Sequence, residues 1–164
     1  MTTEDSMKPP YLGLLNAICI AERNAGVYLT AWADRTPDPE LKRTLTLVAA
    51  RETTHGEVFR QRIERLGFSL LDTDDPRLAE RLRVYSDSAL SDVEKIAAFR
   101  RAPVEEAALD EFFASIDEQV ADESVDALTR DTLRWFVHEE RDSRALLRAA
   151  YARVEGGKPV RTTR

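Results

Sequence analysis

The chain has 164 residues, of which 43% are hydrophobic and 33% are charged, and its net charge is -6. This length suits one domain, and the composition is too hydrophobic for a disordered chain. The acidic balance argues against a nucleic-acid partner, because binding to phosphates needs a clustered basic surface. The single cysteine, Cys19, excludes an internal disulfide and a four-thiolate iron centre.

No targeting or membrane segment is visible in the sequence. The first ten residues, "MTTEDSMKPP", are polar and acidic rather than basic and then apolar, as a secretory signal would be. The longest mostly apolar run covers residues 11 to 21 and is too short to span a bilayer. We therefore expect a cytoplasmic protein without a membrane partner.

The first half of the chain predicts two long helices. The first follows the Pro9–Pro10 pair and runs to about Arg35, with apolar residues at helical spacing. The second covers about residues 39 to 66, because Asp38 is a typical N-cap before a proline and Gly67 is a natural end. Helices of about 25 residues are nearly 40 Å long, which suits a long bundle.

A long connection follows, from Gly67 to about Ala98. It contains two helix-start signals: Asp75 before a proline, and a capping box from Ser91 to Glu94. These signals predict short helices within the connection.

The second half predicts two further long helices. The third covers about residues 97 to 121, with Pro103 as a possible kink, and the fourth covers about residues 124 to 155. Two glycines end the fourth helix, and residues 156 to 164 are expected to form a flexible tail. The predicted fold is all-α: one four-helix bundle over residues 1 to 155, with a long crossover between its second and third helices.

The two halves resemble each other when the sequence is shifted by 88 residues. Residues 44 to 59 then align with residues 132 to 147, and Glu52 falls on Glu140. The apolar columns agree as well, which indicates two similar helix pairs.

The same shift aligns a second pair of acids, Glu22 with Asp110, but it places Ser143 opposite His55. Each half thus has one acid on its first helix and another on its second. Only in the first half is the acid of the second helix followed, three positions later, by a histidine.

Periodicity places several of these polar groups among apolar residues. Alternating steps of three and four residues put Glu52 and His55 in the inward seam of the second helix. Glu22 and Glu140 occupy inward positions of the first and fourth helices in the same way. The direction of Asp110 on the third helix stays open, because three apolar residues compete for the inward face: Leu109, Phe113 and Ile116. Glu106 lies one turn before Asp110 on the same side of that helix.

An ionised carboxylate in a dry core costs many kcal/mol unless it is paired or binds a metal. A Glu from each of two helices, with Glu-x-x-His from the other two, holds two iron or manganese ions in some bundle cores. Residues three positions apart share a helix face, so Glu52 and His55 could reach the same ion.

The segments "AERNAGVYL" and "LVAARETTHGEVFRQRIERLG" resemble the ferritin-like superfamily, and within it the rubrerythrin-like proteins. The resemblance covers the chain in helix order, and its specific part is residues 18 to 66. It implies a set of metal ligands: Glu22, Glu52 as a bridge, His55 as a terminal ligand, Glu140 as a second bridge, and Asp110 or Glu106 from the third helix.

The resemblance implies oxidase, peroxidase, ferroxidase or oxygenase chemistry at a di-iron or iron and manganese centre. Since the chain lacks the cysteines of a rubredoxin domain, a redox cycle would need an external reductant. We expect a homodimer. Ser143 leaves the second half-site incomplete, so a non-catalytic bundle that serves as a binding or scaffold protein remains an alternative. Iron storage, which needs a large cage, is a third.

Overall fold

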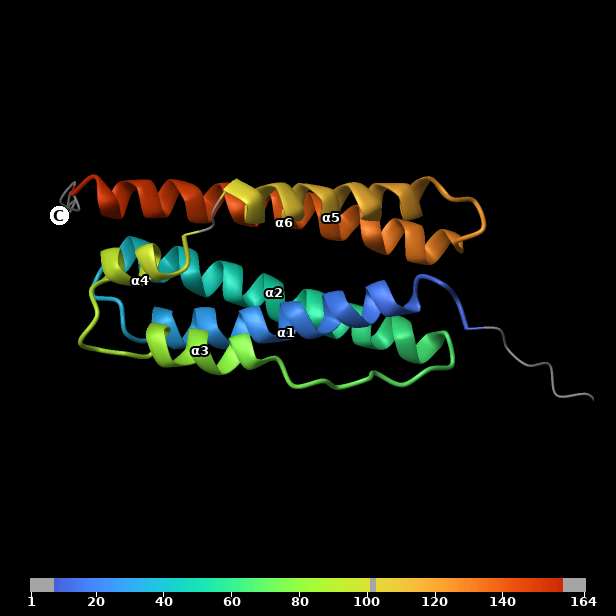
Figure 1. The fold of residues 1–164 in the computed structure, drawn as a ribbon, viewed down its shortest axis with the longest axis horizontal. Coiled ribbons are helices and arrows are strands. Elements are labelled where there is room, and N and C mark those ends of the chain that lie inside the picture. Colours follow the sequence, from blue (N-terminus) through green and yellow to red (C-terminus); the bar gives the residue numbers. More distant parts are fainter. Residues whose placement is uncertain (1–7, 101–102, 158–164) are drawn as a thin grey trace, which may run out of the picture.

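The computed structural model describes residues 8 to 100 and 103 to 157, and the side chains of residues 103 to 106 lie outside this description. Within that part the chain is entirely helical, with no strand, which confirms the predicted all-α class (Figure 1). It has four long and two short helices: α1 (Leu12–Ala33), α2 (Pro39–Arg65), α3 (Pro76–Tyr85), α4 (Asp92–Ala98), α5 (Pro103–Ala121) and α6 (Ala127–Glu155).

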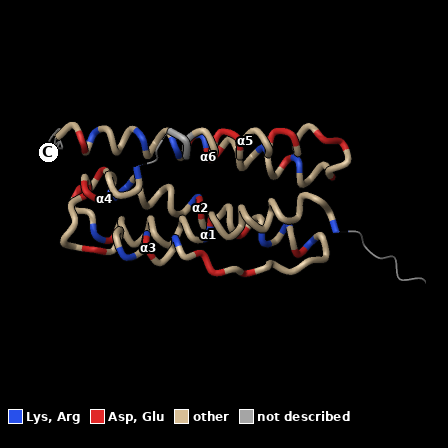
Figure 2. Tube along the Cα trace, viewed as in Figure 1, with Lys and Arg blue, Asp and Glu red and all other residues tan. Residues whose placement is uncertain are grey.

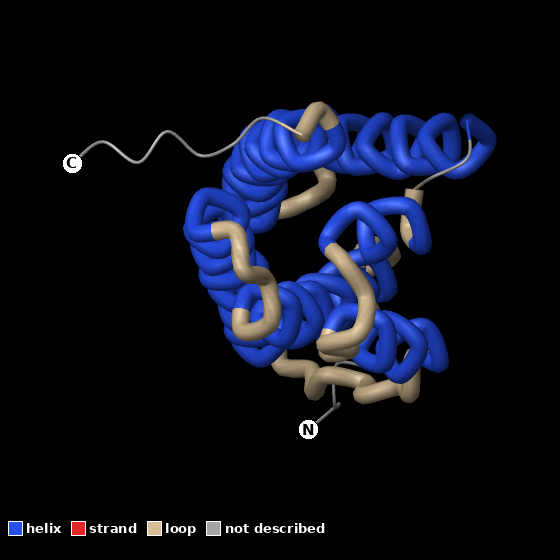
Figure 3. The backbone as a smooth tube through the Cα atoms, turned by 90° about the vertical axis from the view of Figure 1, so that its left-hand side faces the viewer, coloured by secondary structure: helices blue, strands red, loops and turns tan. Residues whose placement is uncertain are grey.

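The long helices pack in the spatial order α1, α2, α6, α5. Helix α1 lies along α2, α2 contacts α6, and α6 contacts α5. The short helix α3 packs on α1, and α4 lies between α3 and α6. Viewed end-on, the helices follow an open arc rather than a closed ring (Figure 3). The short helices expected between the second and third long helices are thus present.

The predicted boundaries of α2 are confirmed, and local chemistry explains them. The Asp38 side chain accepts hydrogen bonds from the backbone N–H groups of Glu40 and Leu41, which no helical carbonyl satisfies. At the other end, Gly67 takes the left-handed conformation with a φ of 86°. This conformation costs glycine little, so the chain can turn out of the helix there.

The predicted start of the third helix at residue 97 is wrong. Helix α4 ends at Ala98 with Phe99 as its C-cap, and α5 begins at Pro103. A proline restricts the residue before it to extended conformations but is well suited to the first turn of a helix. Pro103 therefore begins a helix instead of kinking one.

Helix α6 begins slightly later than predicted, at Ala127, with Asp126 as its N-cap. The carboxylate of Asp126 accepts hydrogen bonds from Thr129, from Tyr11 and from the Arg62 guanidinium of α2. These contacts tie the start of α6 to two other segments. At its end, α6 stops at Glu155, and most of the expected tail, residues 158 to 164, lies outside the described residues.

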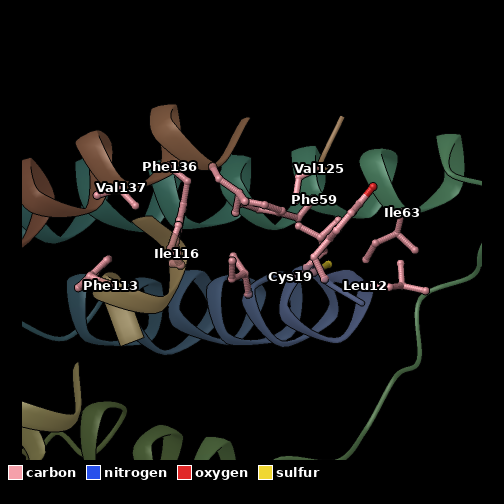
Figure 4. Packing of buried hydrophobic residues seen from close by; sticks show 13 residues of the cluster. Leu12, Cys19, Phe59, Ile63, Phe113, Ile116, Val125, Phe136 and Val137 are labelled. Carbon is pink, nitrogen blue, oxygen red and sulfur yellow. The ribbon is translucent and has the colours of Figure 1, made fainter. Parts of the chain in front are cut away.

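The described residues form two apolar clusters, and one of them joins the four long helices (Figure 4). Phe59 and Ile63 of α2 are fully buried there, as are Ile116 of α5 and Leu133 of α6. Complete burial of one such side chain contributes about 1.5–3 kcal/mol to stability. This cluster fills the half of the molecule where the α5–α6 turn lies, and it adjoins a group of buried polar residues.

Helix α5 carries acidic residues and no Lys or Arg, whereas charged residues of both signs are interspersed along α2 and α6 (Figure 2). This is the distribution expected for helix faces in contact with water. In the described part of the chain, no helix combines the length and the apolar character needed to cross a bilayer.

Candidate metal centre

Four side chains from three helices converge in the interior. They are Glu22 of α1, Glu52 and His55 of α2, and Glu140 of α6, and each offers one ligand atom within 4.8 Å of the others. The sequence predicted all four as metal-ligand candidates, and the structure brings them together.

The group is shielded from water. His55 is 0% exposed, Glu52 is 5% exposed and Glu22 is 8% exposed. The histidine Nδ1 lies 3.0 Å from Oε2 of Glu22 and 3.4 Å from Oε1 of Glu140. Oε1 of Glu140 is buried, yet it accepts no hydrogen bond from any group in the described part of the chain.

The predicted seams explain why these polar groups are buried. On α2, Val48 and Phe59 flank the pair at one-turn spacing and are buried with it. On α1, Ile18 and Ala25 flank Glu22 in the same way, and on α6 Phe136 precedes Glu140 by one turn. The apolar residues of each helix drive burial and carry the polar ones inward.

Burial dominates the electrostatics of the carboxyl groups. It raises the pKa of Glu22 to about 8, with a further increase from the charge of Glu140, while a hydrogen bond with Glu52 opposes the rise. Burial also raises the pKa of Glu52 to about 11, helped by the hydrogen bond and the negative charge of Glu22. Without a cation, these two carboxyl groups therefore hold protons near neutral pH.

Two aromatic side chains fix the His55 ring. Trp135 and Phe136 contact it edge-on, with ring centroids 5.0 Å and 5.4 Å away. The other ring nitrogen, Nε2, is buried and makes no hydrogen bond within the described residues. Only Nδ1 is directed toward the carboxylates.

The remaining predicted ligands do not join the group. Asp110 on α5 is exposed and is absent from the four residues that converge. The backbone of Glu106 belongs to α5, but its side chain lies outside the described residues. Ser143 is buried one turn after Glu140, and its hydroxyl accepts a hydrogen bond of 3.4 Å from Arg51.

Two glycines allow α1 and α2 to approach closely beside the centre. A Cβ atom on Gly56 would lie 3.2 Å from the backbone nitrogen of Arg23 and 3.3 Å from the carbonyl oxygen of Cys19. A Cβ atom on Gly26 would overlap the hydroxyl oxygen of Thr53. Any larger residue at these positions must therefore push against the neighbouring helix.

A pocket of about 520 Å³ opens beside the centre, and three of its lining residues are the carboxylates Glu22, Glu52 and Glu140. All six helices contribute to its wall, which is rich in aromatic residues and arginines. The sequence did not predict this pocket. Its wall depends on where α3 and α4 pack, and no periodic pattern in the sequence encodes that.

The donor set suits a transition metal. Carboxylates and imidazole together are typical ligands of iron, manganese and zinc, and the unsatisfied Glu140 oxygen leaves a position for a cation. No protein-family model, curated protein or solved structure matches the chain. The case for a metal centre therefore depends on the geometry of these side chains.

Proposed function

We propose that the chain is a ferritin-like four-helix bundle of the rubrerythrin-like kind, which binds iron or manganese and performs oxidation–reduction with oxygen or peroxide. The convergence of Glu22, Glu52, His55 and Glu140 in a buried site carries this proposal. Three carboxyl groups this close together repel one another when ionised, and a divalent cation would remove that repulsion.

Each residue has a distinct role in the proposed centre. His55 supplies a neutral donor at Nδ1, and its aromatic neighbours fix the direction of that donor. Glu22 of α1, Glu52 of α2 and Glu140 of α6 would supply the carboxylate ligands of the metal. When bound, iron or manganese would supply the electron transfer, and the protein groups would set charge and geometry.

The incomplete second half-site favours one competing function, a bundle that kept the fold but acts without catalysis as a binding or scaffold protein. Its supporting observations are Ser143 in place of a histidine and the exposed position of Asp110. The number of ions bound per chain separates the two functions.

Metal analysis of protein purified after growth with iron and manganese tests the proposal. We expect about two ions per chain for a di-metal centre, bound by coordination at all four residues. Glu52→Gln keeps the side-chain volume but removes a charged ligand, and should lose most of the metal. Glu57→Ala is the control, since Glu57 lies on the same helix but is exposed. Metal-free protein, or equal metal content in both variants, would contradict the proposal.

Activity provides the second measurement. A peroxidase should consume peroxide steadily when an external reductant is present, and Glu52→Gln should lose that activity. An iron store would instead accumulate ferric mineral without turnover of the reductant. Loaded protein that consumes neither oxygen nor peroxide would favour the non-catalytic alternative.

A further inference from the structure

We propose that the pocket beside the carboxylate cluster binds an organic monocarboxylate with an apolar body, whose carboxylate pairs with Arg81 while its apolar end lies over the cluster. Binding of this ligand does not depend on the proposed metal chemistry. Its assignment as the substrate of the cluster rests on the proposed function.

Arg81 is the anion-binding group. Its guanidinium carbon lies 5.0 Å from the ring centre of Tyr28 and 4.9 Å from that of Phe99, and the residue is half-buried. Arg81 lines the pocket, and its guanidinium contacts these two rings but forms no ion pair with a carboxylate of the described residues. A partly desolvated cation held between aromatic rings attracts an anion, and its planar fork matches a carboxylate.

The charge of the wall supports the same assignment. Among the described residues outside the cluster, the lining contains four arginines and one glutamate, Glu155, which pairs with Arg100. Arg144 and Arg148 have interactions of their own, so the assignment depends on Arg81. The three other glutamates of the lining belong to the cluster. A ligand with one anionic and one apolar end can place its charge away from these acids.

The pocket lining also has an apolar part. It includes Phe112 and Phe113 of α5, and Phe136 and Leu147 of α6. Tyr28, which contacts Arg81, is six residues from Glu22 on α1, so the two are separated by about 9 Å along the helix. A ligand that spans this distance is much longer than peroxide, and the apolar lining suits an alkyl or aryl chain.

The pocket volume agrees with such a ligand. At about 520 Å³ it falls within the usual size of small-molecule sites. A medium-chain carboxylate fits with room for some solvent.

The wall that carries Arg81 is held in place by contacts behind it. The Trp32 ring stacks on Tyr85 of α3 at 4.7 Å and on Tyr151 of α6 at 5.5 Å. The Trp32 indole nitrogen also donates a hydrogen bond of 2.7 Å to Asp92, at the start of α4. These contacts fix α3 and α4 against the long helices, so the pocket is formed before a ligand enters.

Calorimetric titration of the metal-free protein with decanoate tests binding. We expect saturable binding, at least tenfold weaker in Arg81→Gln and unchanged in Arg83→Gln, whose parent arginine is exposed on the same helix and does not line the pocket. Decylammonium has the same chain with the opposite charge and should not bind. No decanoate binding to the folded protein, equal affinity in both variants, or binding of decylammonium would overturn the proposal.

The orientation of bound decanoate can be measured by proton relaxation in protein loaded with Mn²⁺. The paramagnetic ion should relax the terminal methyl protons of bound decanoate faster than the protons next to its carboxylate. The reverse order would show that the carboxylate faces the cluster and would overturn the proposed orientation. If Mn²⁺ does not bind, the proposed metal function fails, and the calorimetric comparison still decides whether the pocket binds carboxylates.

Discussion

The orientation of the His55 ring determines which of its two nitrogen atoms can bind a metal in the centre. Trp135 and Phe136 contact the His55 ring edge-on, and only Nδ1 faces the carboxylates. A ring fixed in this way loses little further freedom when it binds a cation, which favours binding. The aromatic residues next to the centre therefore have a positioning role in addition to packing.

Ser143 is the position where a single change should strengthen the centre. It is buried, lines the pocket and lies one turn after Glu140, where the internal repeat would place a second histidine. Because the pocket provides space for the ring, we expect Ser143→His to add a ligand and to tighten Mn²⁺ binding by roughly 10–100-fold. Competition titration with a metal chelator measures this affinity.

The matched control for that substitution is Ala145→His. Ala145 lies on the same helix but is exposed and faces away from the centre. The Ala145→His substitution should leave the Mn²⁺ affinity unchanged. Equal affinity in the Ser143→His variant and the unaltered protein would show that the repeat does not extend to the metal site.

The sequence could predict the convergence of Glu22, Glu52, His55 and Glu140 because each lies in a continuous apolar seam. The seam fixes the rotation of its helix, and therefore the direction of the polar residue within it. Asp110 lacks that constraint, since several apolar residues compete for the inward face of α5. In the structure Phe113 is buried and Asp110 is exposed.

At the level of helices, the spacing between α1 and α2 determines the geometry of the centre. Gly56 follows His55 directly, and the backbone of α1 lies next to it. Gly56→Ala places a methyl group 3.2 Å from a backbone atom that cannot move independently. We expect a loss of about 1–3 kcal/mol in the free energy of unfolding, together with weaker metal binding.

Urea unfolding and metal titration together check this prediction. Gly13→Ala is the control: Gly13 lies within α1, the other helix of this pair, and an added Cβ there meets no atom within 4 Å. Since alanine favours helix more than glycine, that variant should be as stable as the parent or slightly more stable. A Gly56→Ala protein with normal stability and metal affinity would show that the helix spacing tolerates the extra methyl group.

For the short helices α3 and α4, the sequence predicted their presence but not their position in the fold. Capping residues predicted that α3 and α4 exist, because a cap is a local interaction between neighbouring residues. Their positions depend on distant contacts such as the one from Trp32 to Asp92, sixty residues apart. The pocket wall, and with it the role of Arg81, is therefore visible only in the structure.

For the whole molecule, the buried carboxyl groups link folding, protons and metal. The pKa of Glu22 rises from 4.5 to about 8 on folding, so between these values the folded protein binds more protons than the unfolded chain. Stability then falls as pH rises through this window. The metal-free protein should accordingly lose a few kcal/mol of stability between about pH 5 and pH 8.

Metal binding should follow the opposite course, because a cation competes with the protons held by Glu22 and Glu52. A cation that binds only the folded state raises its melting temperature in proportion to how well it binds. We therefore expect added Mn²⁺ to raise the melting temperature little near pH 5 and by several degrees near pH 8. Thermal unfolding over this range, with and without Mn²⁺, measures both effects. Glu52→Gln carries no charge at this position in either state, so its metal-free stability should vary less with pH and respond weakly to Mn²⁺. A metal-free protein whose stability increases between pH 5 and pH 8 would show that the buried carboxyl groups are ionised in the folded state.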